Sequence, residues 1–503
     1  MNVAFFVQRS YSAQLTRRLT QHYRQLYPAA RFFVLSYTHR PDAEYLRGLD
    51  LFEEVCSEGE MHLKAAHVKP DPTVLERLER DYGAPTLWQF VTQNRLLTMT
   101  YFGDLFRYGA PYSRDELLAH VQTRFVETEA FLERAEPDVV VFPEVDVGPS
   151  SAFILERIAK KRGVPVLVPK STRLGSYHTF TDTVFSHIPH VEKRFKHYLA
   201  EPDFDKDRAE EVLELLRRGS LPLSYIEYEF NGSPLSKTER IFRALRLRLK
   251  RSYLDSGDPI LPSPLQYDLQ TIITTWRRWR SRIAGHFEQP DFEQPYVFFP
   301  LHLEPELSLM LYAPFYTDQL SIVRNVAQSL PVSTCLYVKD HLVAQGRRRP
   351  EFYKQVAGIP NVRLIASGCD SLELIRHSQG VVSITGTAAL EAALLGKPAL
   401  TFGDVFFNCL EGPIQHTHDF EKVPEILKSF ADYEADEATL LAFVAALLEN
   451  SVAVDPLVLG KALMLGPDDL AQRSESFKDY AAALLKEIEL KVAQPPPALS
   501  FLE

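Results

Sequence analysis

The 503-residue chain contains few cysteines and no long apolar run. The four cysteines are scattered, without a C-x-x-C pair or a histidine at metal-ligand spacing: Cys56, Cys335, Cys369 and Cys409. This pattern favours reduced, mostly buried thiols in a reducing compartment. No apolar segment reaches the length that a bilayer requires. The N-terminal "MNVAFFVQRS" is too short and lacks the basic start of a signal peptide. We therefore expect a cytoplasmic protein.

A general excess of positive charge is also missing, since the formal net charge is −10. Nucleic-acid binding needs a basic face, so we expect no nucleic-acid partner. Two stretches are basic nonetheless, 237–252 and "WRRWRSR" at 276–282. Basic helices that carry Trp, Leu and Phe can lie on an anionic membrane surface. The alternative is that these helices span the domains and pair their arginines with carboxylates. The protein is therefore expected either free in the cytoplasm or peripheral on the inner membrane.

Buried strands alternate with helical patterns in two parts of the chain. In the first part we predict strands at 2–7, 31–36, 138–142 and 165–168, and helices near 12–27 and 150–162. In the second part we predict strands at 296–302, 334–340, 362–365, 380–385 and 398–402, and helices near 317–329, 350–357, 371–377 and 388–395. Continuous apolar strands separated by single helices predict parallel sheets that are covered on both faces.

These patterns predict an α/β protein with two facing Rossmann-like domains. We place the first domain at 1–200 and a helical, basic connecting region at 201–290. The second domain follows at 291–440, and C-terminal helices with a Pro-rich tail fill 441–503. Ligands of open parallel sheets bind outside the carboxyl ends of the strands. Two such domains can therefore hold one half of a substrate pair each.

The stretch "SITGTAALEAALLGKP" at 383–398 predicts a strand, a turn and a short helix. Thr385 or Thr387 can cap the helix, and Gly386 allows a close approach of a ligand to the backbone. Gly396 is placed for a left-handed helix end. The free N–H groups of this turn form an anion site with the helix dipole, and Glu391 can reach a bound ribose. The alternative is an ordinary strand–helix turn and a solvated glutamate.

Two further clusters follow strands of the second part. In "FFPLHLEPELSLM", His302, Glu304 and Glu306 share one face of an extended chain, and a carboxylate there can act as a general base. In "YVKDHLVAQGRRR", Lys339 and His341 leave the next strand, and with the following arginines they can stabilise a departing nucleotide. The alternatives are loop carboxylates paired with arginines, and a buried, satisfied His341. The three clusters together suit transfer from an activated nucleotide.

With these residues in view, the chain resembles the capsule polysaccharide biosynthesis proteins, a bacterial glycosyltransferase family that includes Kdo transferases. The resemblance rests on "FPLHLEPELS", "LYVKDH" and "SITGTAALEAALLGKPALTFG" and covers about 296–403. It implies a GT-B fold, in which 1–200 is the acceptor-side domain and 291–440 is the nucleotide-sugar-binding domain. It also implies an inverting, metal-independent transfer, from a CMP-sugar in the Kdo enzymes, without a cofactor. It also implies active-site carboxylates and nucleotide-binding residues, which match Glu304, Glu306, Lys339, His341, Ser383, Thr385, Gly386, Thr387 and Glu391.

The leading hypothesis is a glycosyltransferase of capsule or surface polysaccharide assembly that uses a nucleotide sugar and a saccharide or lipid-linked acceptor. One alternative is a nucleotide-sugar epimerase of similar architecture, and another is a non-catalytic scaffold of the assembly machinery. No metal site is expected. His416 and His418 are spaced like metal ligands, but no third ligand stands at a familiar distance in the sequence, so we interpret them as loop or cleft residues.

Overall fold

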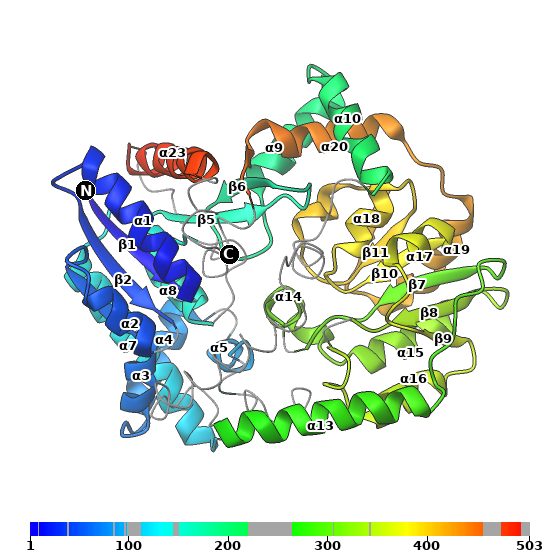
Figure 1. Cartoon of the computed structure of the whole chain (residues 1–503), viewed down its shortest axis with the longest axis horizontal. Coiled ribbons are helices and arrows are strands. Elements are labelled where there is room, and N and C mark those ends of the chain that lie inside the picture. The colour runs from blue at the N-terminus through cyan, green and yellow to red at the C-terminus, as the bar shows by residue number, and fades with distance from the viewer. Residues whose placement is uncertain are drawn as a thin grey trace, which may run out of the picture.

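The structure is a computed structural model of the whole chain (Figure 1). It describes residues 1–8, 10–37, 40–83, 86–94, 97, 112–143, 150–219, 264–304, 306–341, 344–455 and 474–493. The basic stretch 237–252 lies outside these residues. Figure 1 shows two halves, each built around one sheet, with helix α13 running along one side from the first half to the second.

The first sheet contains seven strands in the order β13-β6-β5-β4-β1-β2-β3. The strands are β1 (Asn2–Val7), β2 (Arg31–Ser36), β3 (Glu54–Ser57), β4 (Val139–Val141), β5 (Val166–Ser171), β6 (Tyr177–Thr181) and β13 (Val452–Ala453). Strands β1 to β5 pair in parallel, whereas β6 and β13 pair antiparallel. The predicted parallel sheet is confirmed, and the antiparallel edge extends it.

The second sheet contains six parallel strands in the order β12-β11-β10-β7-β8-β9. They are β7 (Tyr296–Pro300), β8 (Cys335–Lys339), β9 (Val362–Ile365), β10 (Gly380–Ser383), β11 (Ala399–Thr401) and β12 (Ile414–His416). The first five agree with the predicted strands. The order changes direction at β7, between β8 and β10, and ligands of such sheets bind at this kind of switch point.

Helices cover both faces of each sheet. Those that begin in the first 200 residues are α1 (Ser10–Leu26), α2 (Arg40–Arg47), α3 (Glu58–Ala65), α4 (Pro72–Tyr82), α5 (Trp88–Thr92), α7 (Arg114–Ala135), α8 (Ser150–Lys161) and α9 (Pro189–Ala200). Later helices are α10 (Lys206–Arg217), α13 (Pro264–Ile283), α14 (Leu307–Tyr312), α15 (Gln319–Ser329), α16 (Pro350–Ala357), α17 (Ser371–His377), α18 (Ala388–Leu394), α19 (Val423–Ser429), α20 (Glu437–Glu449) and α23 (Ser474–Ala493).

The side chains of each strand alternate between two apolar cores, one on each face of its sheet. In β1, Ala4 and Phe6 enter one core, whereas Val3, Phe5 and Val7 enter the other. In β7, Phe298 and Phe299 divide in the same way. Because both faces are covered, these strands are continuously apolar, which is the pattern that made them recognisable in the sequence.

The position of a helix in the sequence does not determine which of the two sheets it packs on. Helices α9 and α10 pack on α20 and belong to a core of the second sheet. Helix α23 returns to the first half, where the Tyr23 hydroxyl donates to Ala481 O (3.1 Å) and the Tyr480 hydroxyl donates to Pro143 O (2.7 Å). Within the described residues, the chain therefore enters the second half between β6 and α9 and returns to the first half between α20 and β13. Among the described helices, none is both long and apolar enough to traverse a bilayer.

Candidate active site

The three sequence clusters meet at one edge of the second sheet. Strand β7 lies between β8 and β10, and both pairings are parallel. The residues that follow these strands therefore emerge side by side at the carboxyl edge, as expected. The segment after β7 leads into α14, whose Tyr312 hydroxyl donates to Val184 O of the first half (3.2 Å). The edge thus lies beside a direct contact between the two halves (Figure 1).

His302 is a buried residue that joins β7 to the turn after β10. Its Nε2 accepts the Thr385 N–H (3.2 Å) and lies 3.4 Å from Ser383 Oγ. The Gln319 side chain holds its backbone from both sides, accepting from His302 N (2.7 Å) and donating to His302 O (3.1 Å). Burial, together with Arg348 and His341, lowers the pKa of His302 to about 3. The ring is therefore neutral, and the hydrogen bond that its Nε2 accepts from Thr385 positions the turn.

The turn from Ser383 to Thr387 is tightly packed. The Gly386 N–H donates to Ser383 Oγ (2.9 Å), and a Cβ at Gly386 would lie only 2.6 Å from that oxygen and 3.2 Å from His302 Cε1. Glycine is therefore needed at 386 for the contacts inside the turn. Among the described residues, the buried Thr385 hydroxyl has no hydrogen-bond partner. A ligand bound at the turn can form a hydrogen bond with this buried hydroxyl.

The expected threonine cap of α18 is wrong. Thr387 precedes the helix with helical backbone angles (φ −61°, ψ −17°) and makes no side-chain cap hydrogen bond. A residue in that conformation cannot turn its hydroxyl toward the first N–H groups of the helix. Instead, Thr387 Oγ1 donates to Glu391 Oε1 (3.2 Å). The other end of the helix is as expected, because Gly396 adopts a left-handed conformation (φ 77°).

The two candidate carboxylates after β7 occupy different environments. Glu304 is buried, forms an ion pair with Arg348 (3.2 Å) and accepts a hydrogen bond from the Gln319 amide. Arg348 also pairs with the buried Asp340 (3.1 Å). Glu306 is half-buried and immediately precedes α14. Of the two, Glu304 is held in an ion pair, which agrees with the alternative interpretation. Glu306 precedes the helix whose Tyr312 contacts the first half.

Arg348 is the centre of this buried network. Its guanidinium binds Glu304, Asp340 and His302 O, and the Tyr353 hydroxyl donates to Asp340 Oδ2 (2.5 Å). Burial acts to lower the pKa of Arg348, but the carboxylates of Asp340 and Glu304 outweigh it and raise that pKa. The guanidinium is therefore permanently charged. It braces the loops after β7 and β8.

Lys339 and His341 lie at the end of β8 on the same edge. Lys339 Nζ donates to Ser371 Oγ (2.6 Å). Burial lowers the pKa of Lys339, although Asp370, Cys369 and Glu391 act to raise it. Burial is also the main cause that lowers the pKa of His341. The influence of Glu391 on the pKa of Lys339 indicates that Glu391 of α18 lies near the end of β8.

Sequence reasoning missed Gln319, Asp340 and Tyr353, and it considered Arg348 only as one of a run of arginines that could stabilise a departing nucleotide. Asp340 and Arg348 stand inside quoted motifs, but their residue types give no sign that they are buried. Gln319 begins the following helix and Tyr353 lies in α16, so neither is near its partner in the sequence. Arg348 stands between two other arginines in "GRRRP", and a run of arginines is more often exposed.

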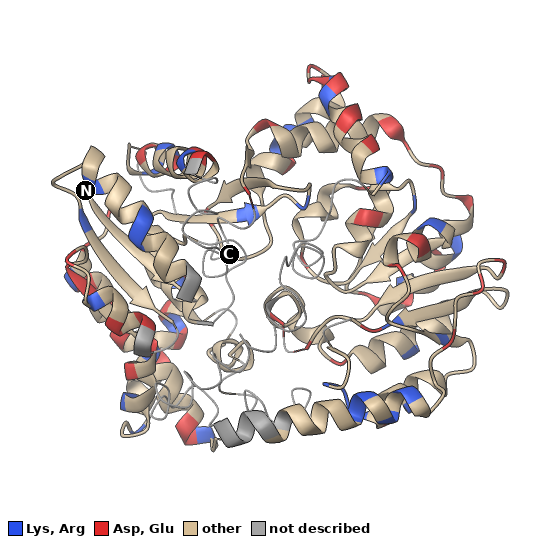
Figure 2. Ribbon diagram, viewed as in Figure 1, with Lys and Arg blue, Asp and Glu red and all other residues tan. Residues whose placement is uncertain are grey.

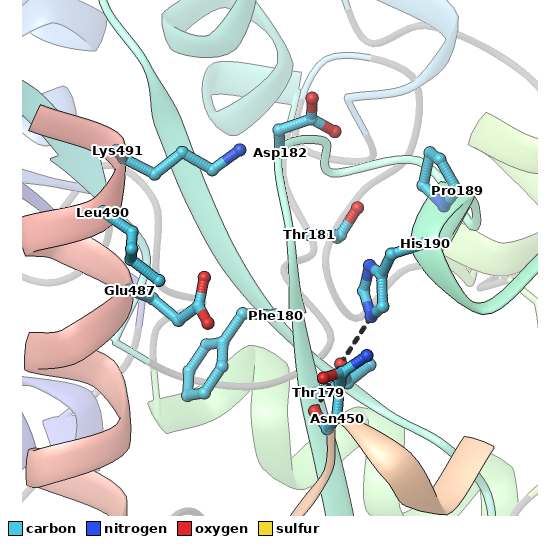
Figure 3. A pocket seen from close by; sticks show the side chains of 10 residues that line it. All are labelled: Thr179, Phe180, Thr181, Asp182, Pro189, His190, Asn450, Glu487, Leu490 and Lys491. Carbon is cyan, nitrogen blue, oxygen red and sulfur yellow. Dashed lines mark hydrogen bonds between the residues drawn. The ribbon is translucent and has the colours of Figure 1, made fainter. Parts of the chain in front are cut away.

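A cavity of about 350 Å³ lies elsewhere, where the chain crosses between the halves (Figure 3). Strand β6, the start of α9 and helix α23 line it. In Figure 3 His190 points toward Thr179, and these side chains form a 2.9 Å hydrogen bond. The cavity contains none of the predicted site residues. It is a feature of the connection between the halves.

The fold and this sheet edge define a GT-B-type α/β protein with two Rossmann-like sheets. The family model of the capsule polysaccharide biosynthesis proteins matches residues 266–441, so this part of the chain is similar to that family. The match includes most of α13, the whole second sheet and every predicted site residue. The resemblance noted from the sequence is thereby confirmed.

Individual relatives are distant. Protein FixF of Sinorhizobium fredii (strain NBRC 101917 / NGR234) is 31% identical over 128 residues, which are 24% of this chain and 30% of FixF. The chain thus matches less than a third of the length of this relative. The Thermosulfurimonas dismutans KpsC beta Kdo 2,7 transferase is 13% identical, with 72% of this chain and 88% of that chain covered and a TM-score of 0.36. The Methanocaldococcus jannaschii UDP-GlcNAc 2-epimerase is 11% identical, with 87% and 94% covered and a TM-score of 0.25.

Proposed function

We propose that the protein is a glycosyltransferase of capsule polysaccharide assembly that takes its sugar from a nucleotide donor. The observation that carries this proposal is the convergence of Lys339, His341 and the 383–387 turn at one sheet edge, within the segment that matches the capsule family. The buried Thr385 hydroxyl, which has no hydrogen-bond partner among the described residues, faces a ligand in this proposal. Glu391, from the start of α18, binds the ribose.

The proposed reaction is a single displacement. The acceptor hydroxyl oxygen forms a bond to the anomeric carbon, and the bond from that carbon to the donor phosphate oxygen breaks. The nucleotide leaves with the electron pair, and Lys339 and His341 hold its phosphate. A carboxylate takes the proton of the hydroxyl. Glu306 suits this role better than Glu304, because Glu304 is buried in an ion pair. This mechanism inverts the anomeric configuration and needs no metal.

A Kdo-like sugar carried by CMP is our first candidate donor, and the acceptor is a saccharide or a glycolipid. Closure of the two halves would exclude water and limit hydrolysis of the donor. The contact between Tyr312 and Val184 links the loop of Glu306 to such a movement, because α14 joins that loop to the first half. Anomeric NMR of the product tests the predicted inversion.

A thermal-shift panel tests the nucleotide site. CMP, CDP, UMP, UDP, GDP and ADP are added separately to the chain in a chelator. We expect stabilisation by CMP that is lost in His341→Ala and retained in the control His377→Ala, which changes an exposed histidine of α17. Stabilisation by UDP alone would keep the site but replace the donor. If no nucleotide shifts the melting temperature, the scaffold alternative takes precedence.

Turnover then separates the enzyme classes. A transferase consumes donor only when acceptor is present, whereas an epimerase converts the donor by itself. Both reactions are measured on the same chain with candidate donors. Conversion of the donor without acceptor would overturn the transferase proposal in favour of the epimerase.

We also propose that α13 rests on an anionic membrane surface. Its exposed face carries Ile272 (65% exposed), Trp279 (61%) and Ile283 (64%), with Trp276 between them. Arginines gather in the second half of the helix (Figure 2). Arg277 donates to Arg347 O (3.3 Å), which fixes the helix to the second half of the protein. Exposed indoles beside arginines suit the interface of an anionic bilayer.

Liposome co-sedimentation tests this surface. We expect the chain to bind vesicles with anionic lipid and the double variant Trp276→Ala/Trp279→Ala to bind less. Trp88→Ala is the control, because Trp88 is also exposed (41%) but lies in α5. Equal binding by all three proteins, or binding that does not depend on anionic lipid, would contradict the proposal. The alternative, in which the helix spans the domains and its arginines pair with carboxylates, would then hold.

A further inference from the structure

We infer that Asp404, His416 and His418 form a binding site for a divalent transition-metal ion, with Zn²⁺ as the ion that fits best. Asp404 follows β11, His416 ends β12, and His418 stands two residues later. Their ligand atoms lie within 4.8 Å of one another. The two histidines alone did not suggest a metal site in the sequence. Pairing of β11 with β12 in parallel brings Asp404 to them as the third ligand.

Both histidine rings present Nε2 to the same carboxylate oxygen. His416 Nε2 lies 3.4 Å from Asp404 Oδ1, and His418 Nε2 lies 3.6 Å from it. Ligand atoms that sit about 2.0–2.2 Å from a tetrahedral Zn²⁺ are about 3.4 Å apart. Both histidine nitrogens therefore already lie at about the separation from Asp404 Oδ1 that zinc ligands have, and all three atoms lie within 4.8 Å of one another.

The hydrogen bonds of His416 set its tautomer. Its Nδ1 lies 3.2 Å from Thr401 O and 3.3 Å from Thr401 Oγ1. The carbonyl can only accept, and the Thr401 hydroxyl already donates to Asn408 Oδ1 (2.8 Å). Nδ1 must therefore carry the proton. The Nε2 lone pair of the neutral ring is left to face Asp404.

The hydrogen bonds of His418 likewise place its proton on Nδ1. The Tyr316 hydroxyl donates to His418 O (3.0 Å), so its oxygen accepts from His418 Nδ1 (3.3 Å). A second lone pair thus faces the carboxylate of Asp404. Two acceptor nitrogens beside an acceptor oxygen repel one another unless a cation lies between them. Histidines bound to metals commonly donate their second N–H to such partners.

The donor set selects the class of metal. Two imidazole nitrogens and one carboxylate suit Zn²⁺, Co²⁺ or Ni²⁺, whereas Mg²⁺ and Ca²⁺ prefer oxygen ligands throughout. Asp404 (57% exposed) and His418 (59%) are accessible to an ion from solution. Three protein ligands leave a position for water or another oxygen ligand.

The site adjoins the proposed donor turn without sharing residues with it. Gly403, next to Asp404, packs so closely on Thr385 that an added Cβ would lie 2.2 Å from Thr385 Cγ2. The Asp404 N–H donates to Tyr312 O (2.9 Å), at the end of α14. The metal proposal does not depend on the proposed transfer reaction, which is written without a metal. Metal binding and nucleotide binding are measured separately.

Cobalt binding to the tag-free full-length chain, after removal of metals with EDTA, tests the site. We expect one Co²⁺ per chain, with the visible absorption of a tetrahedral nitrogen–oxygen complex, and displacement by Zn²⁺. Asp404→Asn and His416→Ala should lose this binding by at least about tenfold, and Tyr316→Phe should weaken it about tenfold. His197→Ala is the matched control, because His197 faces Asp203 (3.2 Å) without a second histidine in the described part of the chain.

One variant gives a signal that depends on direct ligation. His418→Cys replaces a nitrogen ligand with a thiolate, so bound Co²⁺ should acquire an intense sulfur-to-cobalt charge-transfer band. The melting temperature of each metal-free variant checks that the fold is intact. The inference is overturned if the chain shows no saturable binding, if all variants bind equally, or if His418→Cys binds Co²⁺ without the new band.

Discussion

His302 shows how a single buried side chain makes the molecule sensitive to pH. Its pKa falls from the ordinary 6.5 to about 3, mainly through burial. Below about pH 6.5 the unfolded chain binds a proton that the folded chain refuses, so stability falls on acidification through this window, by up to about 1.4 kcal/mol per pH unit. We predict that His302→Gln, which still accepts from Thr385 but cannot titrate, loses less stability between pH 7 and 5.5.

Thermal unfolding at several pH values checks this prediction. Arg348 and His341 remain in the variant, so any pH dependence that they contribute is common to both proteins. Parallel curves for the variant and the wild type would show that His302 does not carry the effect.

Arg348 is the residue whose loss we expect to be most damaging. Replacing it with methionine leaves Glu304 and Asp340 buried without a countercharge. Breaking a buried ion pair from one side destabilises a protein by about 3–5 kcal/mol. Arg349→Met, at the exposed neighbouring position, should change the free energy of unfolding by no more than about 0.5 kcal/mol. Denaturant unfolding of both variants measures the difference, and similar values for the two would contradict the role given to Arg348.

At the scale of elements, the sequence predicted the strands better than it predicted the side-chain contacts between loops. Apolar runs such as 296–302 marked buried strands, because parallel sheets bury both faces, and the residues after β7, β8 and β10 do meet at one edge. The threonine cap failed because Thr387 is already helical. The network around Arg348 and the approach of Asp404 to two histidines depend on contacts between loops, and local patterns do not encode these.

The helix end at Gly396 offers a test of local geometry. Its left-handed φ of 77° is strained for any residue with a Cβ, although the nearest atom to an added Cβ, that of Ala435, would be 3.5 Å away. We predict that Gly396→Ala destabilises the protein by about 1–2 kcal/mol through backbone strain alone. Gly368→Ala, where nothing lies within 4 Å and φ is not positive, should be neutral or slightly stabilising. Chemical denaturation compares the two, and an equal effect would exclude strain as the cause.

At the scale of the whole molecule, the last described helix belongs to the first sheet. Tyr480, Leu484 and Ile488 of α23 are buried in a core that they share with β1, β2 and α1. The predicted range 441–503 contains this helix, but its amphipathic pattern could not show which half it covers. The first half is therefore completed by residues almost 500 positions away, and the two halves are joined by a chain that crosses back.

This arrangement predicts that a change in α23 loosens one half of the protein only. Ile488→Ala removes a fully buried side chain, and such truncations cost about 2–5 kcal/mol. Leu490→Ala, on an exposed side chain (45%) of the same helix, is the control. Because local stability varies across a structure, hydrogen exchange followed by mass spectrometry should show faster exchange in β1, β2 and α1 and unchanged exchange in β7 to β12. Acceleration of both sheets together would mean that the halves unfold as one cooperative unit, and acceleration of neither would remove α23 from the first core.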